Sequence, residues 1–212
     1  QALNPNSSAF RAPLNQISHA KNVATPQDKS IVAPNVDTPY SYAWLDLQAE
    51  PIILTLPKVN KGRYVAIQLI DSYTYIIDYI KPSHAGKTSY MLVGPGWIGQ
   101  APKSIEKVIR ADTNIALALY RTELLNTKDI ETVHSLQKQY LVQTLSEYES
   151  NPEQAKPSLP PLVKPVDIRK DPTNIDFFTV LNWMLSSMPT LPQEINLRNQ
   201  FAKIGIKPGE VF

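Results

Sequence analysis

The sequence predicts a mainly β fold with helical additions (α+β), in which an antiparallel β-sandwich carries a helical subdomain. Short β-rich runs follow one another at roughly ten-residue spacing with turn signals between them, which is typical of a sandwich or a barrel. Proline is abundant, with 19 residues against 7 glycines, and this argues against a bundle of long helices. Apart from one short helix in the first segment, helical periodicity appears only after the strand-rich part of the chain.

Composition limits the classes of protein to consider. The chain has 212 residues, 42% of them hydrophobic and 19% charged, so it is long enough to bury a substantial core. Its net charge of +2 comes from scattered Lys and Arg, so no nucleic-acid partner is predicted. The absence of cysteine excludes disulfides and thiol catalysis. No run approaches the roughly 18–20 apolar residues of a membrane span. The three histidines lie far apart in the sequence, and neither a metal site nor a cofactor is predicted.

The strands are expected after a polar first segment. Residues 1–34 are predicted to be irregular with one short helix, and residues 35–125 are predicted to form the sandwich core. A turn at Asn60–Gly62, where Gly supplies a positive φ, precedes a run with two mostly apolar faces, which is therefore expected to be a central strand. The expected strands are 42–47, 50–57, 62–71, 73–80, 89–96, 107–112 and 115–124.

Helices are expected in the last third of the chain. In the segment 126–150 a helix is predicted over 128–138, capped by Asn126 or Thr127. Residues 151–166 are rich in proline and are predicted to be a semi-rigid linker. In the segment 167–212 one helix is predicted to start at Asp171–Pro172, with a buried stripe, and a shorter one to run over 193–204 and end at Gly205. The stripe comprises Phe177, Leu181, Met184 and Met188.

Five blocks in the order PNVDTPYSYAWLDL, RYVAIQLIDSYT, YMLVGPGW, VHSLQKQY and FAKIGIKPGEVF closely resemble a bacterial family, domain of unknown function 1254. The resemblance runs from about residue 15 to residue 212, with departures at Val36 and Pro39. It implies a small immunoglobulin-like sandwich with a helical portion, and a periplasmic or secreted location. Many members continue into a second domain, domain of unknown function 1214. The chain is therefore expected to be either an excised domain or a natural single-domain version of the family. No reaction is established for this family, so the resemblance does not predict one.

The first block raises a choice between a rigid corner and a reactive site. Asn35 and Asp37 can accept hydrogen bonds from backbone N–H groups two residues on, which fixes a turn before the strand. In the structural interpretation, Asp37 is such an acceptor, and its replacement by Ala should lower the melting temperature. In the functional interpretation, Asp37 is a ligand or a general base and Tyr40 is a donor. The corner is favoured, because nothing nearby in the sequence supplies a catalytic partner for Asp37.

The run QLIDSYTYIIDY is the second candidate. Alternate positions Tyr73, Tyr75, Ile77 and Tyr79 are predicted to form an aromatic row. Rings beside an amide and a carboxylate suit a pocket for a sugar-like or aromatic polar ligand, although tyrosines also pack in sandwiches without one. The ligand-binding candidates are Tyr40, Gln68, Tyr73, Tyr75, Tyr79 and Gln137.

His134 and Gln137 are the third candidate, because both fall on the apolar stripe of the predicted helix 128–138. The structural interpretation is that both side chains are buried and bonded to backbone or to an acid. The functional one makes His134 a general base at a cleft between sandwich and helix, working with Asp37 or Asp71.

Two functions follow from these candidates. The favoured one is a binding or structural module of a larger exported protein, with a small polar or carbohydrate-like ligand. The alternative is one domain of a hydrolase that uses an acid and His134; the sequence leaves open whether the chain is an enzyme. Strands with two apolar faces also predict contact with a second domain or a second copy.

Overall fold

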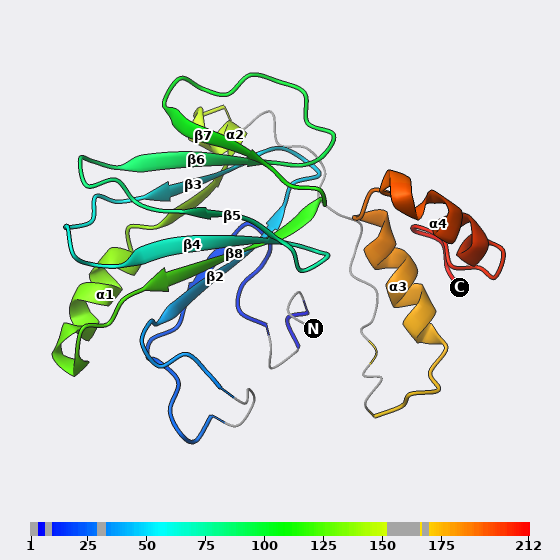
Figure 1. Cartoon of the computed structure of the whole chain (residues 1–212), viewed down its shortest axis with the longest axis horizontal. Coiled ribbons are helices and arrows are strands. Elements are labelled where there is room, and N and C mark those ends of the chain that lie inside the picture. The colour runs from blue at the N-terminus through cyan, green and yellow to red at the C-terminus, as the bar shows by residue number, and fades with distance from the viewer. Residues whose placement is uncertain (1–3, 7–9, 29–32, 152–165, 167–169) are drawn as a thin grey trace.

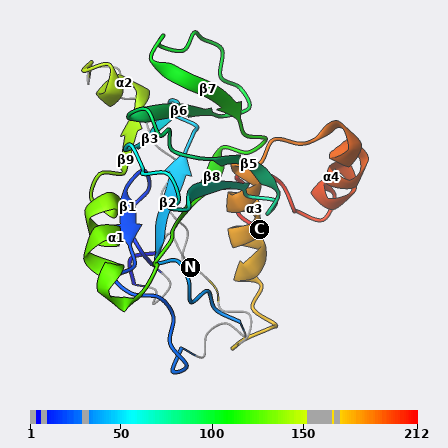
Figure 2. The same cartoon turned by 60° about the vertical axis from the view of Figure 1, so that its left-hand side comes forward.

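The computed structural model describes residues 4–6, 10–28, 33–151, 166 and 170–212, and it shows two β-sheets with few helices (Figures 1 and 2). The mainly β prediction is therefore confirmed, whereas the immunoglobulin-like subclass stays a prediction. The predicted linker 151–166 lies, except for its end residues, outside the described residues. No helix in the described part of the chain is long and apolar enough to cross a membrane.

The first sheet, sheet A, has five strands in the order β1-β2-β8-β4-β5, and all neighbours are antiparallel. The second, sheet B, has four strands in the order β7-β6-β3-β9. The bounds in sheet A are β1 Ile17–His19, β2 Tyr40–Asp46, β4 Val65–Asp71, β5 Ile76–Ile80 and β8 Ile115–Thr122. Those in sheet B are β3 Ile52–Leu56, β6 Thr88–Val93, β7 Ile105–Arg110 and β9 Leu141–Thr144.

The main core lies between the two sheets. Side chains from the inner faces of seven strands form one buried cluster, which includes Leu45 of β2, Leu54 of β3, Ile67 of β4 and Leu92 of β6. Strand β3 is buried at every position, as expected from its uninterrupted apolar run. Strand β4 lies between β8 and β5, so its predicted central place is confirmed. The turn before it has Gly62 at a φ of +94°.

Strands β6 and β7 are parallel, which corrects the prediction of a wholly antiparallel sandwich. The loop between them spans residues 94–104 and returns the chain to the starting end of β6. Parallel neighbours need such a crossover, and a run of strand signals does not reveal its direction. The loop also contributes to packing, because Trp97 and Ala101 cover a second small cluster of Ile53, Met91 and Val93.

The predicted aromatic row does not form, because β5 begins at Ile76 instead of Tyr73. Tyr73 and Thr74 belong to a tight turn, in which Thr74 has a φ of +70° and donates its N–H to the Asp71 carbonyl (3.1 Å). The Asp71 carboxylate accepts the N–H of Tyr75 (2.8 Å). A side chain that bonds to the backbone in this way favours a turn over continued strand pairing.

Strands also occur outside the segment 35–125. Strand β1 lies in the segment for which a short helix was predicted, and β9 follows the helix of the segment 126–150. That helix consists of a 3₁₀ turn, η1 (Thr127–Asp129), and α1 (Ile130–Gln137), close to the predicted bounds. Asn126 caps it by accepting the Lys128 N–H (3.0 Å). A four-residue helix, α2 (Leu145–Tyr148), follows β9.

A helical unit lies at the end of the sandwich opposite α1 (Figure 1). It comprises α3 (Asp176–Ser186), the 3₁₀ turn η3 (Pro192–Glu194) and α4 (Ile195–Ala202). Helix α3 starts later than predicted, and it buries Asn182 and Trp183 instead of the predicted stripe. The end of the last helix at Gly205 is confirmed, since Gly205 has a φ of +87°. The Asn114 N–H joins this unit to sheet A by donating to the Ser187 carbonyl (2.9 Å).

Candidate functional site

The outer face of sheet A gathers polar and aromatic side chains from neighbouring strands. Strand pairing places Tyr40 of β2 beside Arg121 of β8. In the next row Leu119 of β8 pairs with Gln68 of β4, which in turn pairs with Tyr79 of β5. Because side chains alternate along a strand, these residues all point away from the core. Three of the six predicted ligand-binding residues, Tyr40, Gln68 and Tyr79, therefore share one face.

Arg121 links two of these predicted residues. One guanidinium nitrogen donates to the Tyr40 hydroxyl (2.7 Å) and the other donates to the Gln68 side-chain oxygen (3.0 Å). The guanidinium carbon also lies 4.9 Å from the centre of the Tyr40 ring, within cation–π range. We call Tyr40, Arg121 and Gln68 the arginine triad.

The charge of the arginine triad has no carboxylate partner among the described residues, because both acceptors of Arg121 are neutral. The Arg121 Nε–H is buried and has no hydrogen-bond partner in the described structure. Arg11 brings a second guanidinium to the same face, 6.0 Å from the centre of the Tyr42 ring. Burial raises the pKa of Tyr42, so this ring presents a neutral hydroxyl. Around Arg121 the face is consequently rich in hydrogen-bond donors.

Sequence reasoning missed Arg121. A signal was present, since Leu117, Leu119 and Arg121 alternate on one face of the run 115–124 and the last of them is charged. An arginine near a strand end is usually solvated, however, and only the pairing of β8 with both β2 and β4 makes it the centre of a cluster.

The other predicted ligand residues lie elsewhere. Tyr73 reaches the helical unit, where its hydroxyl accepts from Arg198 (2.9 Å) and lies 3.3 Å from the Pro189 carbonyl. The Tyr75 side chain is largely exposed in the β4–β5 turn. Gln137 points into the interior, where its amide lies 3.3 Å from the hydroxyl of Ser41, a residue on the inner side of β2.

Ser41 also contacts a histidine, and this contact is structural. The His19 Nδ1 and the Ser41 Oγ lie 2.8 Å apart, an arrangement that resembles a nucleophile and its base. Ser41 has no exposed surface, so no substrate reaches its hydroxyl. Burial lowers the pKa of His19, and the nearby His134 lowers it further. This network joins β1, β2 and α1.

The predicted catalytic candidates are not brought together. The His134 Nε2 bonds to the Lys21 carbonyl (2.8 Å), and its Nδ1 lies 4.0 Å from a Glu131 oxygen. Asp71 holds the β4–β5 turn, and Asp37 is exposed; neither is a hydrogen-bond partner of His134. The hydrolase alternative stays a prediction that these contacts do not favour. Among the described residues, no group of three or more His, Asp and Glu could hold a metal ion.

The corner before β2 exists, but Asn35 builds it. The Asn35 side-chain oxygen accepts the N–H groups of Asp37 (2.9 Å) and Thr38 (2.8 Å) and lies 3.2 Å from the Thr38 hydroxyl. The Asp37 carboxylate has no hydrogen bond within the described residues, which corrects its expected role as the acceptor. Asn35 comes first in the corner, and its side-chain oxygen accepts both N–H groups.

This geometry predicts different effects for two alanine replacements. Asn35→Ala should lower the free energy of unfolding by about 1–2 kcal/mol, because two N–H groups lose their acceptor. Asp37→Ala, the matched control two residues away, should change it by less than about 0.5 kcal/mol. Urea denaturation followed by circular dichroism measures both. A larger loss for Asp37→Ala would restore the original assignment.

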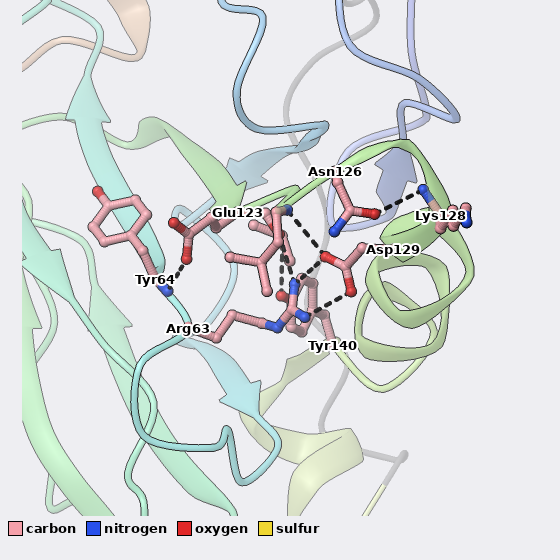
Figure 3. Close-up of polar contacts among 9 residues, drawn as sticks. Arg63, Tyr64, Glu123, Asn126, Lys128, Asp129 and Tyr140 are labelled. Atoms are coloured by element: carbon pink, nitrogen blue, oxygen red, sulfur yellow. Dashed lines mark hydrogen bonds and ion pairs between the residues drawn. The ribbon is translucent and has the colours of Figure 1, made fainter.

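A second polar cluster joins α1 to the sandwich and could be mistaken for a site (Figure 3). Arg63 donates from two nitrogens to the two oxygens of Asp129, each at 2.7 Å, and also donates to the Glu123 carbonyl (2.8 Å). Asp129 also accepts the Leu125 N–H (3.1 Å). These hydrogen bonds from Arg63 are the main cause that lowers the pKa of Asp129 to about 2. Since protein groups already satisfy both side chains, the cluster is structural; we call it the Arg63–Asp129 clasp.

Comparison with known proteins supports the fold and identifies the family of the chain. The crystal structure of the VPA0106 protein from Vibrio parahaemolyticus is similar over 95% of this chain, with a TM-score of 0.68 and 24% identity, which supports the fold. The match covers only 46% of that protein, so the chain spans less than half of its length. A putative uncharacterized protein from Burkholderia cenocepacia matches 50% of this chain and 30% of its own, with a TM-score of 0.34 and 14% identity, too weak to support an inference. No curated protein matches. Residues 14–144 match the family described as protein of unknown function (DUF1254), and the chain therefore belongs to that family.

Proposed function

We propose that the chain is a binding module of a longer, exported bacterial protein, and that it binds a small molecule with an anionic group at the arginine triad. The observation that carries the proposal is the half-buried Arg121, whose hydrogen-bond acceptors are both neutral. A buried guanidinium is normally paired with an acid, because leaving its charge unpaired costs free energy. A ligand carboxylate or phosphate would supply the missing charge.

The hydrogen-bond roles of the triad favour the same chemistry. Arginine only donates, so the Tyr40 hydroxyl and the Gln68 oxygen must accept from it. This leaves the Tyr40 hydrogen and the Gln68 amide hydrogens for other partners. The remaining hydrogens of the triad are thus all free to donate, and a carboxylate is a group that only accepts. The rings of Tyr40 and Tyr42, which meet edge to face at 5.8 Å, add apolar surface for the body of the ligand.

The proposal predicts that Arg121→Gln removes binding of small acids. Calorimetric titration with benzoate, succinate and inorganic phosphate should show saturable binding of at least one by the wild-type chain. Arg121→Gln should weaken it about 10–100-fold, since a hydrogen-bonded charge contributes roughly 1.5–3 kcal/mol. Arg121→Lys keeps the charge but loses the forked donor geometry, so its affinity should lie between those of the wild type and Arg121→Gln.

Lys103→Gln is the matched control, because it removes one positive charge at an exposed position in the loop 94–104. Its affinity for the same acid should equal that of the wild type. The proposal is wrong if none of the three acids binds at millimolar concentration, or if Arg121→Gln and Lys103→Gln have the same affinity.

A further inference from the structure

A pocket of about 760 Å³ lies where the sandwich meets the helical unit. It is bounded by residues 47–50 between β2 and β3, by residues 95–98 of the loop after β6, by Asn114 and by Pro189. Its volume falls in the range of small-molecule pockets, roughly 300–1,000 Å³. None of its lining residues belongs to the arginine triad, so it would be a second site.

The wall formed by residues 95–98 is held in a defined shape. Arg110 of β7 donates to the carbonyls of Gly94 (2.9 Å), Pro95 (3.1 Å) and Trp97 (3.1 Å). A backbone bond from the Trp97 N–H to the Gly94 carbonyl (3.3 Å) closes the turn. A guanidinium that satisfies three carbonyls of one loop fixes that loop before a ligand arrives, which reduces the entropy lost on binding.

Glycines let this wall pack closely. A Cβ on Gly99 would lie 2.6 Å from the Trp97 ring, so the indole occupies space that only glycine leaves free. A Cβ on Gly94 would lie 2.9 Å from the Leu47 carbonyl and 3.2 Å from the Asn114 side-chain oxygen. By contrast, a Cβ on Gly96 would meet nothing within 4 Å. The pocket therefore combines a tightly packed wall with open space at Gly96.

The two side-chain amides of the pocket are neutral and unused. The side-chain amides of Gln48 and Asn114 make no hydrogen bond within the described part of the chain. The backbone of Asn114 is fixed, since its N–H donates to Ser187 and its carbonyl accepts from Leu47 (2.8 Å). The one acid of the lining, Glu50, is engaged by the N–H (2.7 Å) and the hydroxyl (2.8 Å) of Ser146.

We propose that this pocket binds a neutral sugar, a mono- or disaccharide, between Trp97 and the two side-chain amides. An indole offers an apolar surface on which the C–H face of a pyranose ring stacks. An amide both donates and accepts, as a sugar hydroxyl does, so two amides suit neighbouring hydroxyls. The lining contains no Lys or Arg, and its single acid is already satisfied, which favours a neutral ligand over an ion. Ile98, 98% exposed at the edge of the pocket, adds apolar surface for a second ring.

The proposal predicts that sugars change the fluorescence of Trp97. Titration with glucose, N-acetylglucosamine and maltose should give a saturable change in tryptophan fluorescence for at least one. Asn114→Ala should weaken that binding roughly tenfold, the equivalent of about 1.4 kcal/mol. Gly96→Leu should weaken it further, because it adds a bulky side chain at a lining residue whose Cβ position has free space around it. Both variants keep Trp97 and the loop that holds it.

Tyr75→Ala removes an exposed aromatic residue outside the pocket and should bind the sugar like the wild type. Arg121→Gln should also bind it normally, which separates this pocket from the proposed acid site. The sugar proposal fails if none of the three sugars binds at millimolar concentration, or if Gly96→Leu binds as the wild type does while its circular dichroism spectrum is unchanged.

Discussion

Replacement of Asp129 by Ala should lower the free energy of unfolding by about 2–4 kcal/mol, because it leaves the Arg63 guanidinium with one carbonyl in place of a carboxylate. Only 13% of the Arg63 side chain and 11% of the Asp129 side chain are exposed, so water compensates poorly. The Arg63–Asp129 clasp joins residues 66 positions apart, just before β4 and in the 3₁₀ turn before α1. Urea denaturation measures the loss.

The pair Lys107–Asp78 provides the matched control. Its charged atoms lie 2.6 Å apart, as close as those of the clasp, but 57% of the Lys107 side chain is exposed. Lys107→Ala should therefore lower the free energy of unfolding by less than about 1 kcal/mol. Equal losses for Asp129→Ala and Lys107→Ala would show that burial does not set the strength of the clasp.

The clasp also predicts a pH dependence. The folded-state pKa of Asp129 is about 2, below its ordinary value of 3.8, mainly because Arg63 donates to the charged form. A lowered pKa stabilises the folded state fully above the ordinary pKa, and this contribution is lost as the pH falls toward the folded-state value. The stability difference between the wild type and Asp129→Asn should therefore shrink between pH 4 and pH 2. A difference that is constant over this range would contradict the assignment.

Replacement of Asn182 by Ala should release the C-terminal residues from α3. Asn182 has no exposed surface; its side chain accepts the Lys207 N–H (2.8 Å) and donates to the Gly205 carbonyl (2.9 Å). Both backbone groups lose their partner in Asn182→Ala, at a cost of about 2–3 kcal/mol. Hydrogen exchange should rise in residues 203–212, and the melting temperature of the helical unit should fall by several degrees.

Asn199→Ala is the control for this prediction. Asn199 is an exposed asparagine of α4, and its replacement should leave hydrogen exchange in residues 203–212 unchanged. If Asn182→Ala unfolds the sandwich along with the C-terminal residues, then Asn182 supports the whole chain and its effect is not local.

Features that depend on residues close in sequence agree with prediction. The apolar run of β3, the two apolar faces of β4, the Gly62 turn, the Asn126 cap and the Gly205 helix end all occur where expected. Each rests on local periodicity, φ or capping, which a short window contains. Two predictions were wrong because a nearby side chain bonds to the backbone instead. The turn held by the Asp71 carboxylate delays the start of β5, and Asn35 accepts the backbone N–H groups of the corner in place of Asp37.

The sequence predicted only part of the candidate site, and the reason is a different one. Tyr40, Gln68 and Tyr79 were recognised by residue type, but the side chain that unites two of them is Arg121, which is 81 positions from Tyr40 and 53 from Gln68. Residue type indicates what a side chain can do, while its partners depend on which strands pair and in which register.

The sequence by itself determined the mainly β class, the central place of β4, the Asn126 cap, the end of the last helix at Gly205 and the family, because local hydrophobic periods, caps and ordered sequence blocks specify them. The tertiary structure decided the parallel β6–β7 pair, the burial of Ser41 with His19, the arginine triad and the pocket beside Trp97. Each of these joins residues from distant parts of the chain. Hydrogen bonds and ion pairs act over a few ångströms, so they form only after the strands have brought such residues together.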